Sequence, residues 1–564
     1  MASVMELFSM RPTADQDDRV RRYLLPTKLL LTQGAVSGAE HLLEDHPVQA
    51  SLERGDVCLL DNRGTDEKAG LLLDFGRELH GNLQLTTAYV HGPRKRVGLL
   101  VRFGESVSEA LVPIGHKNAT NDHAVRDHVY DMGMLTTAQT GDSGFRFAYI
   151  RLEDPDAALE LQAIHMGFLF RDIPYLGSFR CSDPLLEDIW KTAAYTVHLN
   201  MQSYLWDGIK RDRLAWQGDM HTEVMTLLHV FGPHPIVPKT LDFLRDKTEP
   251  GCWINGFSSY SLWWIIVQGE WYRYTGDLAY LRSQREFLKA QAAMAAGCVD
   301  AQGAERLTQI RFLDWPSSTD EEATHAGLQG LLRLALVEAG MLLELLEEDA
   351  LAQHCTETAQ RMNADGLFPG KAKQAAAFLS LAGLGDPEVL DRDILSPGGA
   401  RGYSTFLGYY ILAAKAKAGD VRGALEDLRE YWGGMLAMGA TSFWEDFDLD
   451  WMENAGRIDQ LPKEGQKDIH ADQGNFCYTG FRHSLCHGWA SGPVPFLMRH
   501  ILGITPLEPG CRKLQICPRL DSLTWAEGTY PTPLGCVTVR HTRLEDGTVQ
   551  TRYTAPEGVE IILA

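Results

Sequence analysis

A long, continuous helical region between two β-rich regions is the feature that most constrains this chain. From Pro184 to about residue 502 apolar residues recur at helical spacing, and Ser182 or Asp183 can cap the first helix. So many helices joined by short loops predict packed helical hairpins, either as a closed (α/α)6 toroid or as an open α-solenoid. The expected helices occupy residues 186–200, 219–231, 258–274, 278–297, 327–347, 348–362, 403–417, 420–434 and 486–502.

The flanking regions carry strand patterns. Residues 145–152 and 536–541 alternate between apolar and polar side chains, as strands with one buried face do. The expected fold class is therefore a multidomain α plus β protein. We predict an N-terminal β-sandwich domain over residues 1–175, a helical domain over 176–505 whose length fits an (α/α)6 toroid, and a C-terminal β-sandwich domain over 506–564.

Charge and cysteine usage narrow the function classes. Lys plus Arg number 53 and Asp plus Glu 75, a net charge of −22, and so acidic a chain is a poor candidate for binding nucleic acid. The sequence predicts neither a membrane-spanning segment nor a signal peptide. The ten cysteines include no Cys-x-x-Cys pair, which favours reduced thiols in a cytoplasmic protein.

The segment over residues 206–221 is the richest in reactive side chains, with three carboxylates, three cations and two tryptophans. Asp212 and Asp219 are seven residues apart, so a helix would place both on one face, and Asp207 could join them from a loop. A surface lattice of salt bridges would have the same composition. Tryptophan faces such as that of Trp216 beside carboxylates are, however, typical of sugar sites.

Two later segments add two further candidate functional residues, Glu445 and His487. Glu445 follows the aromatic pair Phe443-Trp444, and His487 opens an expected helix beside Trp489. A lone histidine is more often structural, but its position between two tryptophan-containing segments favours a functional role. The polar stretch over residues 446–483 joins the two, and we expect it to pack over the pocket and to set the choice of leaving group.

Asp314 and Trp315 form a third candidate cluster after the middle of the helical region. Trp263 and Trp264 are adjacent on an expected helix, and at least one of them is more typical of a core residue than of a ligand contact.

No cofactor or metal site is expected. The chain lacks a P-loop, a Gly-x-Gly-x-x-Gly turn and a His-Glu-x-x-His motif. Asp446, Asp448 and Asp450 have the spacing of calcium ligands, but Trp451 and Arg457 stand where an EF-hand loop requires Gly and Glu. A solvated acidic loop is the better interpretation of that stretch.

Three of these segments, in this order, resemble the motifs of glycoside hydrolase family 78, the α-L-rhamnosidases. They read Asp207-Gly-Ile-Lys-Arg211-Asp212-Arg-Leu-Ala-Trp216-Gln-Gly-Asp219, Ala440-Thr-Ser-Phe-Trp444-Glu445 and His487-Gly-Trp-Ala-Ser-Gly. The first is similar to a branch of shorter members with an Asp-Gly-x-Lys-Arg-Asp-Arg-Leu motif. Many members have Glu where this chain has Asp212, whose side chain is one methylene shorter.

The resemblance implies an (α/α)6 catalytic domain and an inverting mechanism, with Asp212 as the general acid and Glu445 as the general base. The residues it implies for binding the rhamnose are Asp207, Arg211, Trp216, Asp219, Trp264, Asp314, Trp315, Trp444 and His487. Inversion needs a protonated acid at the leaving oxygen and a carboxylate that holds water on the opposite face of the sugar.

The expected partner is a rhamnose-containing glycoside or oligosaccharide, without nucleic acid or membrane, and a homodimer is left open. Two other readings remain. One is a different (α/α)6 enzyme, such as another inverting glycosidase or an unsaturated-uronide hydrolase. The other is a non-catalytic carbohydrate-binding or scaffold protein, which the presence of both Asp212 and Glu445 disfavours.

Overall fold

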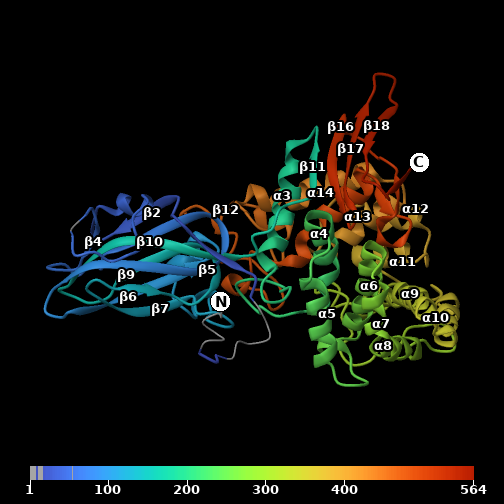
Figure 1. The fold of residues 1–564 in the computed structure, drawn as a ribbon, viewed down its shortest axis with the longest axis horizontal. Helices are drawn as coiled ribbons and strands as arrows, with labels where there is room; N and C mark the ends of the chain where they lie inside the picture. Colours follow the sequence, from blue (N-terminus) through green and yellow to red (C-terminus); the bar gives the residue numbers. More distant parts are fainter. Residues whose placement is uncertain (1–7, 11–16, 54) are drawn as a thin grey trace.

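The computed structural model describes residues 8–10, 17–53 and 55–564. It contains a β-sandwich at one end, a helical toroid, and a second set of strands on the far side of the toroid (Figure 1). The expected fold class is confirmed: a six-hairpin helical core lies between N-terminal and C-terminal β-sheet regions.

The N-terminal strands form one ten-stranded sheet that folds over on itself and encloses a hydrophobic core. The long strand β5 organises it, because β2 and β9 flank its first part and β10 and β8 contact its second part. A register shift between Asp74 and Leu79 separates the two parts. The strands are β1 Val20–Leu24, β2 Lys28–Gln33, β3 Ala35–Ser37, β4 Cys58–Asp61, β5 Gly70–His91, β6 Arg96–Gly104, β7 Asp127–Gly133, β8 Thr137–Gln139, β9 Ser143–Leu152 and β10 Ala158–Phe170.

The helical region closes on itself as an (α/α)6 toroid rather than opening as a solenoid. Along an inner ring, α4, α6, α9, α11, α13 and α15 pack in that order, and α15 returns to α4. The helices are α3 Pro184–Asn200, α4 Met220–Phe231, α5 Ile236–Lys247, α6 Ser258–Thr275, α7 Leu278–Ser283, α8 Arg285–Gly297, α9 Glu321–Leu345, α10 Asp349–Arg361, α11 Lys373–Leu381, α12 Pro387–Leu390, α13 Gly408–Lys417, α14 Val421–Ala437 and α15 Pro493–Phe496.

Burial explains which helices lie inside. Every residue of α4 is buried, as an inner helix requires. The outer helix α5 buries one stripe that includes Ile236, Thr240, Leu241 and Leu244, and it exposes the opposite face. Helix α9 has the length and apolar composition of a membrane-crossing helix, but 72% of its apolar window is buried inside the protein. We therefore assign α9 to the core of the toroid.

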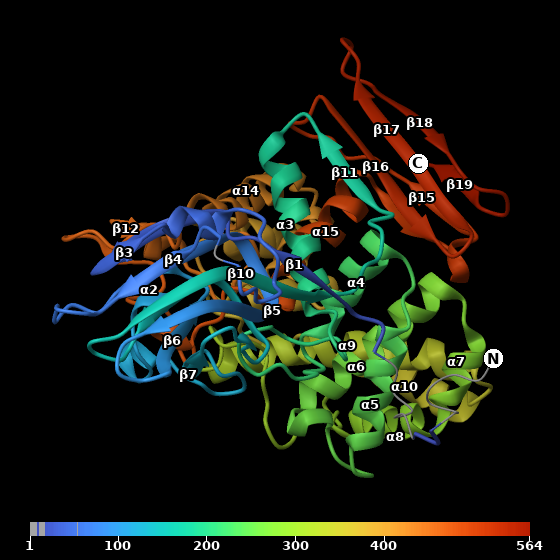
Figure 2. The same cartoon turned by 60° about the vertical axis from the view of Figure 1, so that its left-hand side comes forward.

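The C-terminal strands form two small sheets, and one strand of them comes from far upstream. Strand β11 (Ser178–Cys181) lies in the range expected for the helical domain, yet it pairs with β16 of the C-terminal region (Figure 2). The four-stranded sheet consists of β11, β16 Trp525–Thr532, β17 Gly535–Arg543 and β18 Val549–Thr554, and the three-stranded sheet of β14 Ile504–Pro506, β15 Lys513–Ile516 and β19 Glu560–Leu563.

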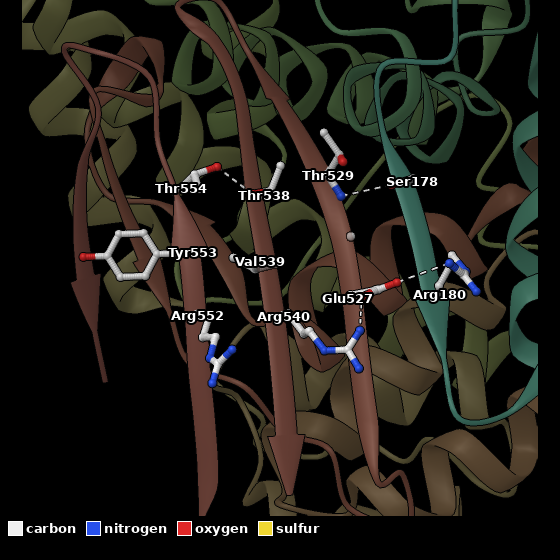
Figure 3. A pocket seen from close by; sticks show the side chains of 11 residues that line it. Ser178, Arg180, Glu527, Thr529, Thr538, Val539, Arg540, Arg552, Tyr553 and Thr554 are labelled. Carbon is white, nitrogen blue, oxygen red and sulfur yellow. Dashed lines mark hydrogen bonds and ion pairs between the residues drawn. The ribbon is translucent and has the colours of Figure 1, made fainter.

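The open face of the four-stranded sheet carries charged side chains. Glu527 on β16 pairs with Arg180 on β11 and with Arg540 on β17, and Arg552 and Tyr553 lie on β18 beside them (Figure 3). Main-chain pairing over Ser178–Cys181 holds the upstream strand against β16, and these exposed ion pairs add little to it. The sheet that packs beside the helical domain thus combines β11, which precedes the helices in sequence, with β16, β17 and β18, which follow them.

Candidate active site

Main-chain hydrogen bonds join the three motif segments at the toroid. The amide of Gly488 donates to the carbonyl of Asp207 at 2.8 Å, and the amide of His487 donates to the carbonyl of Phe443 at 2.9 Å. The Trp489 indole donates to the carbonyl of Glu445 at 2.9 Å. The first motif, which lies more than 200 residues before the other two in sequence, is therefore joined to them in one rigid frame.

Glycine at 488 is a condition for this close approach. A Cβ atom at Gly488 would lie 1.5 Å from Oε1 of Glu223, a buried residue of α4. Any other residue at this position would have to displace the buried carboxylate of Glu223.

The frame encloses a cavity of about 210 Å³. This volume is below the roughly 300–1,000 Å³ of sites for drug-sized ligands and suits a single sugar ring. Eight of the eleven expected site residues line the cavity: Asp207, Arg211, Asp212, Trp216, Asp219, Trp315, Glu445 and His487.

Arg211 links the two carboxylates that the resemblance assigns to acid and base. Its Nη1 donates to Oδ1 of Asp212 at 2.9 Å, and its Nη2 contacts Oε1 of Glu445. The guanidinium also lies over the Tyr478 ring, 5.1 Å from its centroid. One cation thus fixes both acids toward the same space.

Asp212 is the most accessible of the four cavity carboxylates, with 21% of its side chain exposed. Its backbone has φ 54°, in the left-handed region, and Arg213 follows with φ 57°. Two successive non-glycine residues in that region hold the side chain of Asp212 at the cavity while Arg213 turns away to the carbonyls of His123 and Asp142.

Asp207 and Asp219 surround His487 at the buried end of the cavity. The imidazole lies 3.8 Å from Oδ2 of Asp207, 3.6 Å from Oδ1 of Asp219 and 3.5 Å from Oε1 of Glu445. Burial raises the pKa of both aspartates well above its usual range, and neighbouring carboxylates add to the effect. Burial and Arg211 lower the pKa of His487, so the ring is neutral.

Both oxygens of Glu445 are held. Oε1 contacts Arg211, and Oε2 accepts the Ser484 amide at 3.1 Å. Burial raises the pKa of Glu445, while Arg211 and the Ser484 amide oppose that rise. Donors on both oxygens favour the carboxylate form, which a general base requires.

Trp264, Trp444 and Asp314 do not line the cavity. Trp264 is fully buried against Phe287 of the outer helix α8, and Trp444 packs against Phe447 and His483. Trp444 and Glu445 are successive residues, and Glu445 is the one that faces the cavity. Asp314 accepts hydrogen bonds from the Ser317 amide at 3.1 Å and from the Ser404 hydroxyl at 2.9 Å instead.

The sequence missed most of the aromatic wall. The cavity residues that were not predicted are Phe257, Tyr260, Phe312, Cys477, Tyr478 and Trp489. Tyr260 precedes Trp264 by one helical turn on α6. The sequence therefore indicated the correct helix but the wrong aromatic residue on it. Trp489 belongs to the third motif and could have been included, whereas Tyr478 lies in an irregular segment without any sequence signal.

The expectation that residues 446–483 cover the pocket holds for a short part only. Phe476 stacks on Trp315, and Cys477 and Tyr478 line the cavity. The earlier part packs against the N-terminal sandwich instead, where the carbonyl of Ile458 accepts the amide of Val107. Figures 1 and 2 both place β12 (Ala455–Gly456) beside that sandwich.

The N-terminal sandwich reaches the first motif directly. His123 Nε2 lies 3.6 Å from Oδ1 of Asp212. Glu105 and Glu109, which follow β6, bind Lys210 at 2.9 and 3.3 Å. Lys210 immediately precedes Arg211, so the sandwich supports the segment that carries the expected acid.

Within the described ranges, one group of side chains has the mutual distances of metal ligands: Glu105, Glu109 and His470. The Lys210 ammonium already supplies a cation to both glutamates. In the acidic stretch over 446–450, Asp448 accepts the Asp450 amide and Asp450 forms an ion pair with Arg401. These carboxylates therefore have partners within the protein.

Comparisons with known proteins agree with the fold. The family model of the bacterial α-L-rhamnosidase six-hairpin glycosidase domain matches residues 174–363, and that of the bacterial α-L-rhamnosidase C-terminal domain matches residues 503–564. An α-L-rhamnosidase of Alteromonas sp. (strain LOR) is 24% identical over 455 residues, covering 72% of this chain and 46% of its own length.

Two solved structures share the architecture. The family 78 rhamnosidase of Bacillus sp. GL1 has a TM-score of 0.71 and 22% identity, over 93% of this chain and 55% of that one. The rhamnosidase from Klebsiella oxytoca with rhamnose bound has a TM-score of 0.68 and 21% identity, over 86% of this chain and 96% of that one. The chain therefore spans about half the length of the Alteromonas and Bacillus relatives. These matches confirm the resemblance to glycoside hydrolase family 78.

Proposed function

We propose that this chain is an α-L-rhamnosidase, an inverting glycoside hydrolase that releases terminal non-reducing α-L-rhamnose from rhamnosides. The observation that carries the proposal is the pairing of Asp212 and Glu445 through one guanidinium in a cavity of sugar size. The relatives named α-L-rhamnosidase, one of them with rhamnose bound, support the choice of sugar.

In this proposal Glu445 is the general base. It holds a water molecule against C1 of the rhamnose, opposite the leaving group, and removes a proton as the water attacks. Arg211 and the Ser484 amide favour the ionised form of its carboxylate against the effect of burial. A base that is held at both oxygens loses little orientation freedom before reaction.

Asp212 is the general acid. It donates a proton to the glycosidic oxygen as the bond to C1 breaks, and the greater exposure of its side chain suits contact with a leaving group that extends toward solvent. Asp207, Asp219 and His487 bind sugar hydroxyls at the buried end, while Trp216, Trp315 and the other aromatic rings contact the C–H faces of the sugar.

The proposed partner is a rhamnose-containing glycoside, with no cofactor and no metal. A cytoplasmic location remains a proposal, supported by the ten cysteines of the described chain being unpaired. The homodimer remains a proposal as well.

The test is hydrolysis of nitrophenyl α-L-rhamnoside beside a panel of other nitrophenyl glycosides, with the product anomer followed by proton NMR. We expect turnover of the rhamnoside alone and initial release of β-L-rhamnose. Turnover of another glycoside would favour a different (α/α)6 glycosidase. Rhamnose binding without turnover would favour a carbohydrate-binding protein.

A further inference from the structure

We propose that Glu105, contributed by the N-terminal β-sandwich, is a positioning residue for the proposed base Glu445. Glu105 does not line the cavity and touches no reacting atom. It binds two segments of the helical domain at once, one attached to the base and one attached to the acid. The inference rests on the proposed function, since it assigns Glu105 a part in that reaction.

The first link runs from Glu105 to the base through residues 484 and 485. Oε2 of Glu105 accepts the Leu485 amide at 2.6 Å, and Oε1 accepts the Ser484 hydroxyl at 3.3 Å. Ser484 in turn pairs with Glu445 in both directions: its amide donates to Oε2 at 3.1 Å, and its carbonyl accepts the Glu445 amide at 3.0 Å. Glu105 therefore fixes the peptide that fixes the carboxylate.

The second link runs from Glu105 to the first motif. Lys210 donates to Oε2 of Glu105 at 2.9 Å and to the carbonyl of His483 at 2.6 Å. The next residue, Arg211, contacts Glu445 and Asp212. One carboxylate outside the helical domain thus holds both sides of the catalytic frame.

Burial makes this arrangement sensitive to small changes. The Glu105 side chain is fully buried, and burial raises the pKa of Glu105 to about 7 against the opposing effect of Lys210 and the Leu485 amide. Its anionic form therefore depends on those partners staying in place. Glutamine has the same size but only one acceptor oxygen, so either Ser484 or the pair Leu485 and Lys210 would face an N–H group instead of an oxygen. The 484–485 segment must then move, and Glu445 moves with it.

The experiment compares Glu105→Gln with Asp74→Asn. Asp74 is a matched control, because it is a buried carboxylate of the same sandwich that binds Arg146 at 2.8 and 3.0 Å, and Arg146 reaches the helical domain at the carbonyl of Gly439. Asp74 touches neither the 484–485 segment nor Lys210. Loss of domain docking alone would therefore affect both variants alike.

The substrate is nitrophenyl α-L-rhamnoside, whose leaving group needs little protonation, so that kcat depends mainly on the base. We expect Glu105→Gln to lower kcat by about 10–100-fold with KM changed less than threefold. Asp74→Asn should keep kcat within about threefold of the parent. A Glu105→Gln kcat equal to that of Asp74→Asn, or a loss confined to KM, would overturn the positioning role.

A second variant covers the case in which Glu105→Gln fails to fold. Ser484→Ala removes the hydroxyl link and leaves the amide in place, and we expect a threefold to tenfold loss in kcat at constant KM, on the order expected for one hydrogen bond. The double variant should lose no more than Glu105→Gln alone, since both changes act along one path. Unchanged kcat in Ser484→Ala, or losses that multiply in the double variant, would contradict the inference.

Activity of the parent protein separates the two proposals. A parent without turnover on any rhamnoside overturns the proposed function and the role of Glu105 with it. An active parent whose Glu105→Gln variant behaves like Asp74→Asn overturns the role of Glu105 alone.

Discussion

Trp216 donates its indole N–H to Oδ2 of Asp212 over 3.1 Å. Arg211 binds the other oxygen, so both oxygens of the proposed acid are oriented by neighbours within its own motif. The two donors hold Asp212 as an acceptor, whereas the proposed reaction requires it to give up a proton. The role of Asp212 is therefore the first one to test.

Asp212→Asn should show a loss that depends on the leaving group. A nitrophenolate departs without much protonation, whereas an alkoxide needs the proton. We expect kcat/KM of Asp212→Asn to fall by about 10²–10⁴-fold on an alkyl or disaccharide rhamnoside and far less on an activated aryl rhamnoside. Asp207→Asn and Asp219→Asn should harm both substrates similarly, because they contact the sugar that both share. The leaving-group-dependent loss in Asp219→Asn instead would identify Asp219 as the acid.

Glu445→Gln should abolish most turnover without loss of the fold. The amide cannot take a proton from water, so kcat should fall by about 10²–10⁴-fold on both kinds of leaving group. Rhamnose binding, measured by calorimetry, should remain. Activity within threefold of the parent would remove Glu445 from the mechanism.

Asp219→Asn should stabilise the protein at neutral and higher pH. Burial raises the pKa of Asp219 in the folded state, so the folded protein favours the protonated side chain. The raised pKa of Asp219 therefore adds to the free energy of unfolding. This contribution is fully present below the ordinary aspartate pKa of about 3.9 and is lost as the pH rises through the raised pKa. Because asparagine stays neutral, the Tm of the variant should exceed that of the parent at pH 8 and equal it near pH 4.

The exposed Asp546 is the matched control for that comparison, because hydrogen bonds from Thr548 lower its pKa. Asp546→Asn should bring no gain in Tm at pH 8. A Tm of Asp219→Asn at or below the parent's at pH 8 would show that Asp219 is stabilised as an anion.

Phe476→Ala should change the choice of leaving group. Phe476 is 40% exposed and stacks on Trp315, with ring centroids 5.7 Å apart, beside the cavity. We expect KM for a bulky rhamnoside to rise by about threefold to tenfold, with a smaller change for a small one, since one aromatic contact is lost. The control Phe368→Ala removes an exposed phenylalanine that does not stack on Trp315. Equal effects of the two variants would exclude Phe476 from substrate selection.

Removal of metal ions should leave activity unchanged. The ammonium of Lys210 supplies the cation for Glu105 and Glu109, and the acidic stretch over 446–450 binds its own backbone and Arg401. We expect full activity after EDTA treatment and gel filtration. A loss that calcium restores would reveal a metal site in this chain.

The sequence by itself determined the class of fold and most of the site. Helical periodicity predicted the central region, and the resemblance of the three motifs implied a shared cavity, which Asp207, Asp212, Asp219, Glu445 and His487 all line. The helical spacing assumed for Asp212 and Asp219 was wrong, because Asp212 has a left-handed backbone and α4 begins only at Met220. These are local signals: periodicity reports which face of a helix is buried, and a motif reports residues that are close in the chain. The residues chosen within one motif were therefore mostly correct.

Only the tertiary structure decided what depends on contacts between distant segments. Periodicity could not show that β11 joins the C-terminal sheet, because strand pairing over such a separation leaves no local pattern. Trp264 and Tyr260 look equivalent on one helix, and only the packing of α8 shows which of them is core. Glu105 belongs to a sandwich with no motif of its own, and it acquires its role because folding places it between Lys210 and Ser484.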